Sequence, residues 1–471
     1  MKILAFGIRP DGTPLFKPTD EDAVADSLLG ALKKEFPGLR TEGARTTRGA
    51  KKRGEVERRV LDVGDPLEVG WSFLVSAKDP RRTDIERILR PLAQHRGLAP
   101  EARPLYFTGE GEADWGTWLQ DAYYGLALEG TPVPRYVLMV GEPDHLPFKL
   151  QSLLATVACV GRVSFERLDE LEQYVQKLIR LETAAEPVVE RQVLLFGPDE
   201  DISSDPTFYS RRYMVEPLAA RVRDELRFNV ASLVGADATK QGLVSMLHGA
   251  QPALVYTASH GLAPGGKDAA QQARYNGAIC CAGGASTMKA LFSADDVPDD
   301  EPFLEGSVFF QFACFGYGTP AQSDYNHWIR GVPRQYAEAD FLAALPRRLL
   351  AHPRGPIAYI GHLDLAFLHG FADPNERPTA ERWSNRIQPY VQAVDQLLGV
   401  QPSGLAMEGM SKRLNVANQL LMVYYDRQRR GTLEVTPESN RRLVDHWIFR
   451  SDAQNYMVFG DPAARLRIPA P

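Results

Sequence analysis

Two apolar stretches of this sequence each end in a side chain capable of covalent chemistry. Residues 253–261 lead to His260 and a glycine, and residues 307–316 lead to Cys314 and a second glycine. Both are rich in β-branched, aliphatic and aromatic residues, which is typical of buried strands in a parallel sheet. Ligands bind beyond the carboxyl ends of such strands, so we expect the imidazole and the thiol at one edge. A nearby imidazole favours the nucleophilic thiolate, and the pair predicts a cysteine peptidase.

Each residue of this pair also has an ordinary structural interpretation. A free cysteine is commonly part of a hydrophobic core, and a histidine can simply end a strand. The two residues together favour catalysis over packing. A catalytically degenerate protein that binds a partner through the same cleft is the alternative hypothesis. The sequence contains no Gly-x-Ser-x-Gly elbow of a serine hydrolase.

A rival motif directly follows His260. Residues 261–267 fit the Gly-x-x-x-x-Gly-Lys pattern of a phosphate-binding loop after a strand. The next residue is Asp268, where that chemistry needs a serine or threonine to hold magnesium, and an aspartate there would repel phosphate. Nucleotide hydrolysis through Lys267 is therefore the least favoured of the three hypotheses.

The composition is that of an ordinary soluble globular protein. The chain has 471 residues, of which 44% are hydrophobic and 24% charged, and this length allows two or three domains. The net charge of -6 argues against nucleic acid as a partner, because phosphate binding usually requires a basic excess. No stretch approaches the roughly 20 apolar residues that span a bilayer, so we expect no membrane partner.

The cysteines and the first seven residues indicate the cellular compartment of the protein. Four cysteines in so long a chain are not a disulfide framework, and the absence of a Cys-x-x-Cys pair argues against a zinc site. Residues 1–7 contain an apolar run too short for the core of a signal peptide, and they predict a first strand instead. We therefore expect a cytoplasmic protein that needs neither a metal ion nor an organic cofactor.

The proline-rich stretch at residues 131–134 is the predicted domain boundary. Residues 1–130 alternate strand-like and helix-like patterns and predict a smaller α/β subdomain. In residues 131–471 strands alternate with helices, which implies βαβ units and a mostly parallel sheet flanked by helices. An amphipathic helix is predicted over residues 166–182, after a turn at residues 161–163. Further helices are expected over residues 208–226, 340–351, 381–398 and 405–429.

Ordered pieces of the chain resemble the gingipain-like cysteine peptidases of the caspase-fold group. The two strand ends described above look like those of the family. A strand at residues 136–140 before Gly-Glu and Pro147, a Gly-Arg turn before an acidic helix, and a Gly-Asp-Pro at residues 460–462 are also similar. The resemblance covers about residues 135–468 and implies a caspase-like fold. The smaller leading subdomain is compatible with the two-part layout of the family.

The resemblance implies a role for each candidate active-site residue. Cys314 is the expected nucleophile and His260 the base or leaving-group acid, and the backbone N–H groups of Gly261 and Cys314 form the oxyanion hole. A glycine at position 261 lets the backbone approach the scissile carbonyl without a Cβ atom. Glu142 and Asp144, which follow a strand of the same domain, are the candidates for the group that orients the imidazole.

The sequence defines the specificity pocket less well. Gingipains that select arginine or lysine use an acidic group there, and the corresponding residues 149–153 contain none. The candidate pocket residues are Asp364, after a strand end, and Gln311, on the strand that leads to Cys314. Asp364 equally fits a helix N-cap or a surface turn. The sequence therefore does not predict selection of basic residues by the gingipain route.

The resemblance also bears on regulation. Peptidases of this fold are often latent until they are processed or bound to a partner, and similar bacterial members serve in regulated defence pathways. We therefore expect a cytoplasmic cysteine endopeptidase that cleaves proteins or peptides through an acyl-enzyme and that responds to an activating protein partner.

Overall fold

The computed structural model describes most of the chain. The described residues are 2–15, 17–20, 22–24, 61–100, 102–109, 112–199, 201–263, 268–283, 290–326, 328–329, 331–332, 335–372 and 386–470. Within them the strands form one large sheet, one four-stranded sheet and two small two-stranded sheets.

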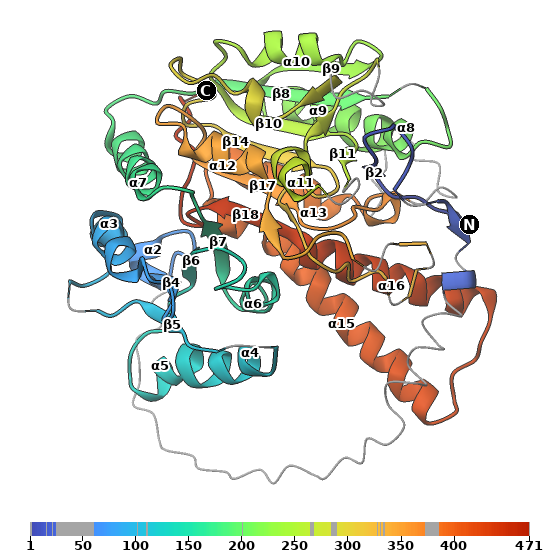
Figure 1. The fold of residues 1–471 in the computed structure, drawn as a ribbon, viewed down its shortest axis with the longest axis horizontal. Helices are drawn as coiled ribbons and strands as arrows, with labels where there is room; N and C mark the ends of the chain where they lie inside the picture. The colour runs from blue at the N-terminus through green and yellow to red at the C-terminus, as the bar shows by residue number, and fades with distance from the viewer. Residues whose placement is uncertain are drawn as a thin grey trace.

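The strands that lead to His260 and Cys314 both belong to the large sheet (Figure 1). Its ten described strands pair in the order β5, β4, β6, β7, β18, β17, β14, β10, β8 and β9. Their bounds are β4 (Trp71–Ser76), β5 (Leu105–Phe107), β6 (Tyr136–Val140), β7 (Cys159–Val163), β8 (Glu190–Pro198), β9 (Asn229–Gly235), β10 (Pro252–Ala258), β14 (Val308–Phe312), β17 (Ala358–His362) and β18 (Tyr456–Gly460). The order places β10, which leads to His260, beside β14, which leads to Cys314.

The sheet consists of two parallel halves that run in opposite directions. The strands β5, β4, β6, β7 and β18 are parallel to one another, and so are β17, β14, β10, β8 and β9. The halves meet at β17 and β18, which pair antiparallel. The carboxyl ends of β10, β14 and β17 therefore lie at one rim of the sheet, and those of β6 and β7 lie at the opposite rim.

The strands β10 and β14 are the two apolar stretches that the sequence places in a parallel sheet. Every residue of both strands is buried, and their register pairs Leu254 with Val308 and Ala258 with Phe312. A strand covered on both faces has no solvent side, which explains why neither stretch alternates regularly between apolar and polar residues. The predicted α/β fold with a mostly parallel sheet is confirmed.

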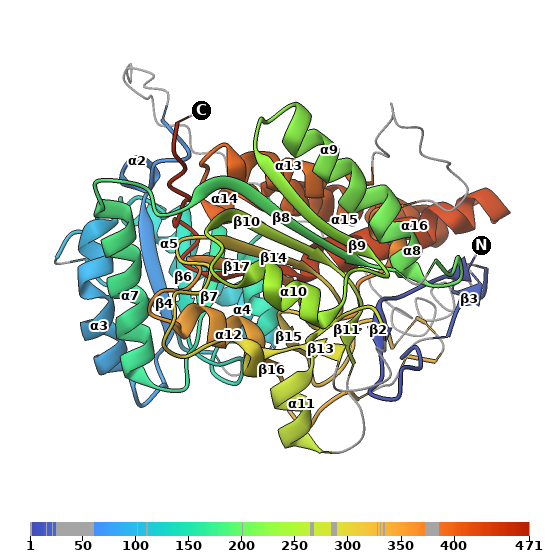
Figure 2. The ribbon, with the colours of Figure 1, turned by 90° about the horizontal axis from the view of Figure 1, so that it is seen from above.

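Helices cover both faces of this sheet. Figure 2 shows α9 (Glu216–Asp224) and α13 (Gln388–Leu398) on one side, and α10 (Lys240–Leu247) and α12 (Ala344–Ala351) on the other. The other α-helices of six or more described residues are α3 (Arg82–His95), α4 (Glu112–Trp118), α6 (Phe148–Leu154), α7 (Leu168–Thr183), α11 (Ala269–Tyr275), α15 (Glu408–Arg429) and α16 (Pro437–Asn455). In α7 the buried residues include Leu171, Val175 and Leu178, as its predicted apolar stripe requires. No described helix has the length and apolar character needed to cross a bilayer.

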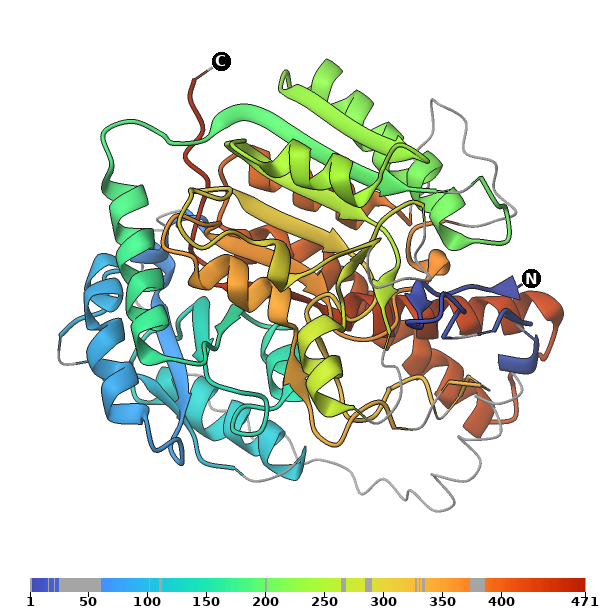
Figure 3. The ribbon, with the colours of Figure 1, turned by 45° about the horizontal axis from the view of Figure 1, so that its top comes forward.

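The first residues do not add a strand to the large sheet. The short strand β2 (Gly7–Ile8) pairs in parallel with β11 (Gly261–Leu262), directly after His260. Together with β12 (Ile279–Cys280) and β13 (Leu291–Phe292) they form the four-stranded sheet. Figure 3 shows this N-terminal segment, in dark blue, beside the half of the large sheet that contains β10 and β14. A short apolar run predicts extended backbone, and it does not predict which partner the backbone takes.

The predicted turn at residues 161–163 is wrong, because these residues belong to β7. A Cβ atom added to Gly161 would stand 2.1 Å from the carbonyl oxygen of Gly460. Arg162 is buried and donates hydrogen bonds to the carbonyl oxygens of Gly141 and Leu146. The glycine therefore marks the close approach of two backbones within a sheet, which is a common reason for glycine in a strand.

The large sheet continues across the predicted domain boundary. The strand β4 precedes residue 131 and pairs with β6, which follows it. A buried ion network also connects the two parts: Arg96 contacts Glu182 and Asp461, and Asp461 accepts a hydrogen bond of 2.9 Å from the indole of Trp71. The division into a subdomain of residues 1–130 and a domain of residues 131–471 stays a prediction.

Replacing Arg96 with methionine is expected to destabilise the protein by about 3–5 kcal/mol, because the buried carboxylates of Glu182 and Asp461 lose their counter-charge. Burial alone would lower the pKa of Arg96, and these carboxylates raise it above its ordinary value. Urea unfolding followed by circular dichroism measures the loss. The control is Arg87→Met, because Arg87 pairs with Asp84 at the exposed surface, where such pairs contribute about 1 kcal/mol or less. Equal urea midpoints for the two variants would contradict the prediction.

Candidate active site

Cys314 lies two residues beyond β14, at the rim where β10 also ends. Its side chain is 0% exposed, and its sulfur accepts the backbone N–H of Ala366 at 3.2 Å. Burial raises the pKa of the thiol above its ordinary value, and the backbone N–H groups of Ala366 and Phe6 oppose that rise by favouring the thiolate. In this arrangement the sulfur has no access to solvent.

His260 lies two residues beyond β10, and both of its ring nitrogens face oxygen atoms. Nδ1 is 2.7 Å from the carbonyl oxygen of Phe6, and Nε2 is 3.0 Å from a carboxylate oxygen of Asp205. Both partners are acceptors, so the ring satisfies both only when each nitrogen carries a proton. Burial alone would raise the pKa of Asp205, and the facing imidazole holds it well below its ordinary value. A carboxylate in this position orients and charges an imidazole, as in catalytic triads.

The ends of the two strands are in direct backbone contact. A Cβ atom added to Gly261 would stand 1.9 Å from the carbonyl oxygen of Cys314, so this position has room only for glycine. The Gly261 N–H, a predicted oxyanion donor, donates to the carbonyl oxygen of Phe6 at 3.2 Å. The imidazole and this donor therefore both contact the carbonyl oxygen of one residue, Phe6, and Gly261 is packed against the backbone of the candidate nucleophile.

Comparisons with known proteins bear on the fold. No protein family and no curated protein sequence matches the chain. A solved structure described as that of a protease matches 84% of this chain and 78% of its own chain, with 14% identity and a TM-score of 0.51. The complex of Porphyromonas gingivalis RgpB pro- and mature domains matches 84% of this chain and 80% of that chain, with 14% identity and a TM-score of 0.47. For the Arg-specific cysteine proteinase gingipain R (RGPB), the shares are 88% and 80%, the identity 14% and the TM-score 0.46.

The fold is caspase-like. The likeness to the protease structure establishes this arrangement of strands and helices, in agreement with the resemblance to gingipain-like peptidases. At 14% identity it does not establish the reaction, which has to be argued from the residues at the site.

Glu142 and Asp144 lie away from His260 in this caspase-like sheet. Both follow β6, whose carboxyl end is at the rim opposite that of β10, because the two halves of the sheet run in opposite directions. The Glu142 carboxylate accepts a hydrogen bond from Ser164 and pairs with Arg347 at 2.6 Å, and Asp144 is exposed. A role for either residue in orienting the imidazole stays a prediction, and Asp205 is the carboxylate that contacts the ring.

Asp364 and Gln311 are both buried, and the protein itself occupies their polar groups. The Asp364 carboxylate accepts the hydroxyl of Ser323 at 2.8 Å. The Gln311 side chain donates to the carbonyl oxygen of Gly277 at 2.7 Å and accepts the hydroxyl of Tyr359. A role for Asp364 and Gln311 in a specificity pocket stays a prediction, and both side chains are buried.

Burial raises the pKa of Asp364 to about 6, and the charge of Asp324 adds to the rise. An unfolded aspartate has a pKa of about 3.9, so the folded state binds this proton more tightly. The contribution of this bound proton to the free energy of unfolding is fully present below about pH 4 and is lost as the pH rises through about 6. Relative to Asp364→Asn, the free energy of unfolding of the wild type should fall by on the order of 3 kcal/mol between about pH 4 and pH 7. Urea unfolding across this range measures the difference, and a constant difference would contradict the prediction.

Asp205 is a site residue that the sequence analysis does not single out. It is the N-cap of α8 (Pro206–Ser210) and accepts a backbone N–H of the first turn at 2.8 Å. The Asp-Pro pair therefore predicts a helix start and nothing more. The same loop contains Asp199 and Asp201, and their residue type does not distinguish them from Asp205. The informative signal is position, because the loop follows β8, and β8 is the parallel neighbour of β10.

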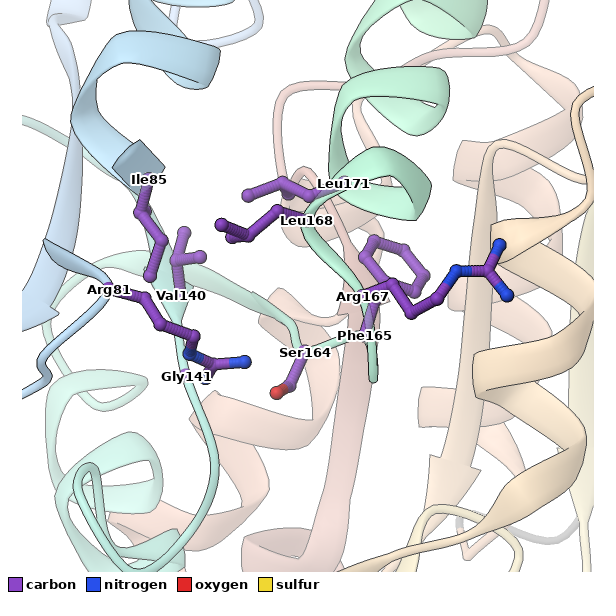
Figure 4. A pocket seen from close by; sticks show the side chains of 9 residues that line it. All are labelled: Arg81, Ile85, Val140, Gly141, Ser164, Phe165, Arg167, Leu168 and Leu171. Atoms are coloured by element: carbon purple, nitrogen blue, oxygen red, sulfur yellow. The ribbon is translucent and has the colours of Figure 1, made fainter. Parts of the chain in front are cut away.

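Other candidate sites lie away from the dyad. Figure 4 shows a hollow at the carboxyl ends of β6 and β7, in which the side chain of Arg167 points away from Arg81. It is lined by Arg81, Ile85, Val140, Gly141, Ser164, Phe165, Arg167, Leu168 and Leu171. Lys267, on which nucleotide hydrolysis depends, lies outside the described residues, and Asp268 is the N-cap of α11. Within the described part of the chain, no three His, Cys, Asp or Glu side chains gather as metal ligands do.

Proposed function

We propose that the protein is a cysteine endopeptidase whose active site is closed in the intact chain. One observation supports this most directly: His260 and the Gly261 N–H both contact the Phe6 carbonyl oxygen, and Gly261 is packed against the backbone of Cys314. A nucleophile, a proton-transfer group and an oxyanion donor have to meet in this way around a scissile bond. The caspase-like fold, which a solved protease structure shares, adds support.

In the proposed reaction, the thiolate of Cys314 attacks the carbonyl carbon of the substrate and forms a tetrahedral intermediate. The N–H groups of Gly261 and Cys314 stabilise the negative oxygen of that intermediate. His260, held by Asp205, protonates the leaving amine, so that the peptide bond breaks and a thioester to Cys314 remains. Water that loses a proton to His260 then hydrolyses the thioester, which releases the new carboxylic acid and the free thiol.

The proposal includes a setting for this activity. The substrates are proteins or peptides, and the compartment is the reducing cytoplasm. All four cysteines are free thiols in the structure, which fits such a compartment. Because the Cys314 side chain is 0% exposed, catalysis needs an event that opens the site, and processing or an activating protein partner would supply it. Service in a bacterial defence pathway stays a prediction from the resemblance.

An electrophilic peptide probe tests the proposed function. We expect covalent labelling of the wild type at Cys314, faster at higher pH because burial raises the pKa of this thiol, and no labelling of Cys314→Ala. The matched control is Cys159→Ala. Cys159 is another buried cysteine, whose pKa burial raises to about 12, and its removal should leave the labelling rate unchanged. Intact-mass spectrometry measures the labelled fraction over time.

One observation favours a second candidate, a catalytically degenerate module that binds a protein partner. The Cys314 side chain is 0% exposed, and a thiol that never reaches a substrate cannot attack it. If probes with different side chains fail to label Cys314 at alkaline pH both in the intact chain and after processing that opens the site, this second candidate is favoured over the peptidase.

A further inference from the structure

Residues 4–8 cross the candidate active site as an extended strand. On one side they pair with the loop that follows β17. The Leu368 N–H donates to the carbonyl oxygen of Leu4 at 3.1 Å, and the Phe6 N–H donates to that of Ala366 at 3.1 Å. The intervening residues of the two segments form an antiparallel bridge. An extended peptide that binds to the edge of another segment is held by the same kind of bonds.

On the other side, the same strand pairs with the residues that follow His260. The Gly261 N–H donates to the carbonyl oxygen of Phe6 at 3.2 Å, and the Ala263 N–H donates to that of Ile8 at 2.6 Å. The segment is therefore held between the loops that follow β17 and β10, at the rim where Cys314 lies.

The strand changes partners at the peptide bond between Phe6 and Gly7. Residues 4–6 pair with the loop after β17, and residues 7–8 pair with β11. The carbonyl oxygen of this bond contacts Nδ1 of His260 and accepts the Gly261 N–H. The N–H on the other side of Phe6 donates to Ala366, whose own N–H contacts the sulfur of Cys314. The Phe6 carbonyl oxygen thus contacts both the imidazole and the predicted oxyanion donor, as the oxygen of a scissile bond does in the proposed reaction.

The side chain of Phe6 fills an aromatic pocket next to the dyad. It is 0% exposed, and its ring centroid lies 4.8 Å from that of Phe312, 5.9 Å from that of Phe371 and 5.8 Å from that of His260. The contact with Phe312 is edge-to-face, an arrangement that aromatic pairs prefer. A charged side chain buried among these rings would need a counter-charge to compensate for its lost hydration. The pocket therefore suits a large apolar side chain.

We propose that residues 4–8 occupy the substrate groove in the register of a substrate, and that the enzyme cleaves after large apolar residues, phenylalanine above all. This inference rests on the proposed peptidase function. It identifies residues 4–8 as the segment that covers Cys314 in the intact chain. It also assigns the selection of the residue before the cleaved bond to the pocket formed by Phe312 and Phe371. Substrates then have to displace this segment, so any change that loosens Phe6 exposes the nucleophile.

A set of tripeptide chloromethylketones that differ only in the last residue tests the specificity. We expect acetyl-Leu-Ala-Phe-chloromethylketone to label Cys314 of the wild type roughly 100-fold faster than the probes that end in Arg or Asp. The labelling rate is measured by intact-mass spectrometry, and Cys314→Ala defines the background. A probe ending in Arg or Asp that reacts faster than the one ending in Phe would overturn the inference.

Phe6→Asp tests the closure of the groove by residues 4–8. A buried aspartate weakens the bound form of the segment, so we expect labelling by the phenylalanine probe to accelerate by about 10-fold or more as the competent fraction grows. The control is Lys17→Asp, because Lys17 is exposed in the same N-terminal region and its change should leave the rate at the wild-type value. Circular dichroism checks that both variants fold.

The outcomes separate this inference from the function on which it rests. A folded Phe6→Asp variant that labels no faster than Lys17→Asp overturns the closure, although the enzyme can still be a peptidase. If Phe6→Asp does not fold, the order of the three probes on the wild type decides the specificity. If no probe labels any variant at Cys314, the proposed function fails and this inference fails with it.

Discussion

Replacing Gly261 with alanine is expected to slow the covalent labelling of Cys314 by at least about 100-fold, which is the typical effect of losing one oxyanion donor. The added Cβ atom would stand 1.9 Å from the carbonyl oxygen of Cys314 and 2.9 Å from its carbonyl carbon. Backbone atoms cannot rotate out of the way as a flexible side chain can. The two strand ends have to separate, and the Gly261 N–H then leaves the place where it would meet the developing negative charge.

The control for this substitution is Gly116→Ala. Gly116 lies within α4, and a Cβ atom added there meets no other atom within 4 Å. We expect this variant to label at the wild-type rate. Thermal unfolding followed by circular dichroism shows whether Gly261→Ala remains folded, which separates a lost donor from a lost fold. A folded Gly261→Ala variant that labels as fast as Gly116→Ala would show that the Gly261 N–H is not an oxyanion donor.

The two strands that lead to His260 and Cys314 can be predicted because buried strands have recognisably apolar sequences. A strand of a parallel sheet that is covered on both faces must be apolar along most of its length, and both β10 and β14 are. Strand ends at one rim follow from parallel pairing, so the approach of His260 and Cys314 to one edge could be inferred without coordinates. The helix α7 can also be predicted from the sequence, because its apolar stripe has the helical period.

Strand direction explains why the sequence does not indicate which carboxylate lies beside His260. A sequence pattern shows that residues 456–460 are a strand, but not that β18 pairs antiparallel with β17. Because of this single pairing, the two halves of the sheet run in opposite directions, and Glu142 lies at the rim opposite His260 and Cys314. The carboxylate that does meet the imidazole, Asp205, comes from a helix cap, whose sequence signal indicates local structure only.

Long-range packing explains two further differences. The helix α16 was not among the predicted elements, because residues such as Leu443, Val444 and Ile448 are buried within a largely polar sequence, and the helix packs against α15. The run at residues 1–7 fits an ordinary strand as well as a segment bound across a site, because both need extended apolar backbone. Only the contacts of Phe6 with His260 and Gly261 distinguish the two.

Asp205→Asn is expected to lower the maximal rate at which a peptide electrophile modifies Cys314 by roughly 100-fold or more, because the imidazole loses its orienting charge. The carboxylate of Asp205 is 3.0 Å from Nε2 of His260. Asparagine is about as good an N-cap as aspartate, so α8 keeps its cap and the substitution isolates the effect of the charge. The probe concentration that gives half of the maximal rate should change little, because Asp205 acts through His260 and does not touch the probe.

Asp201→Asn is the matched control for this prediction. Asp201 lies on the same loop and pairs with Arg212, and its side chain is 78% exposed, so its neutralisation should leave both kinetic parameters at the wild-type values. If Asp205→Asn raises the half-maximal probe concentration and leaves the maximal rate unchanged, Asp205 shapes the binding groove and does not position the imidazole. If both parameters are unchanged, the imidazole needs no carboxylate, and His260 and Cys314 act as a simple dyad. A fall in the maximal rate alone would assign Asp205 the role that the sequence analysis sought in Glu142 and Asp144.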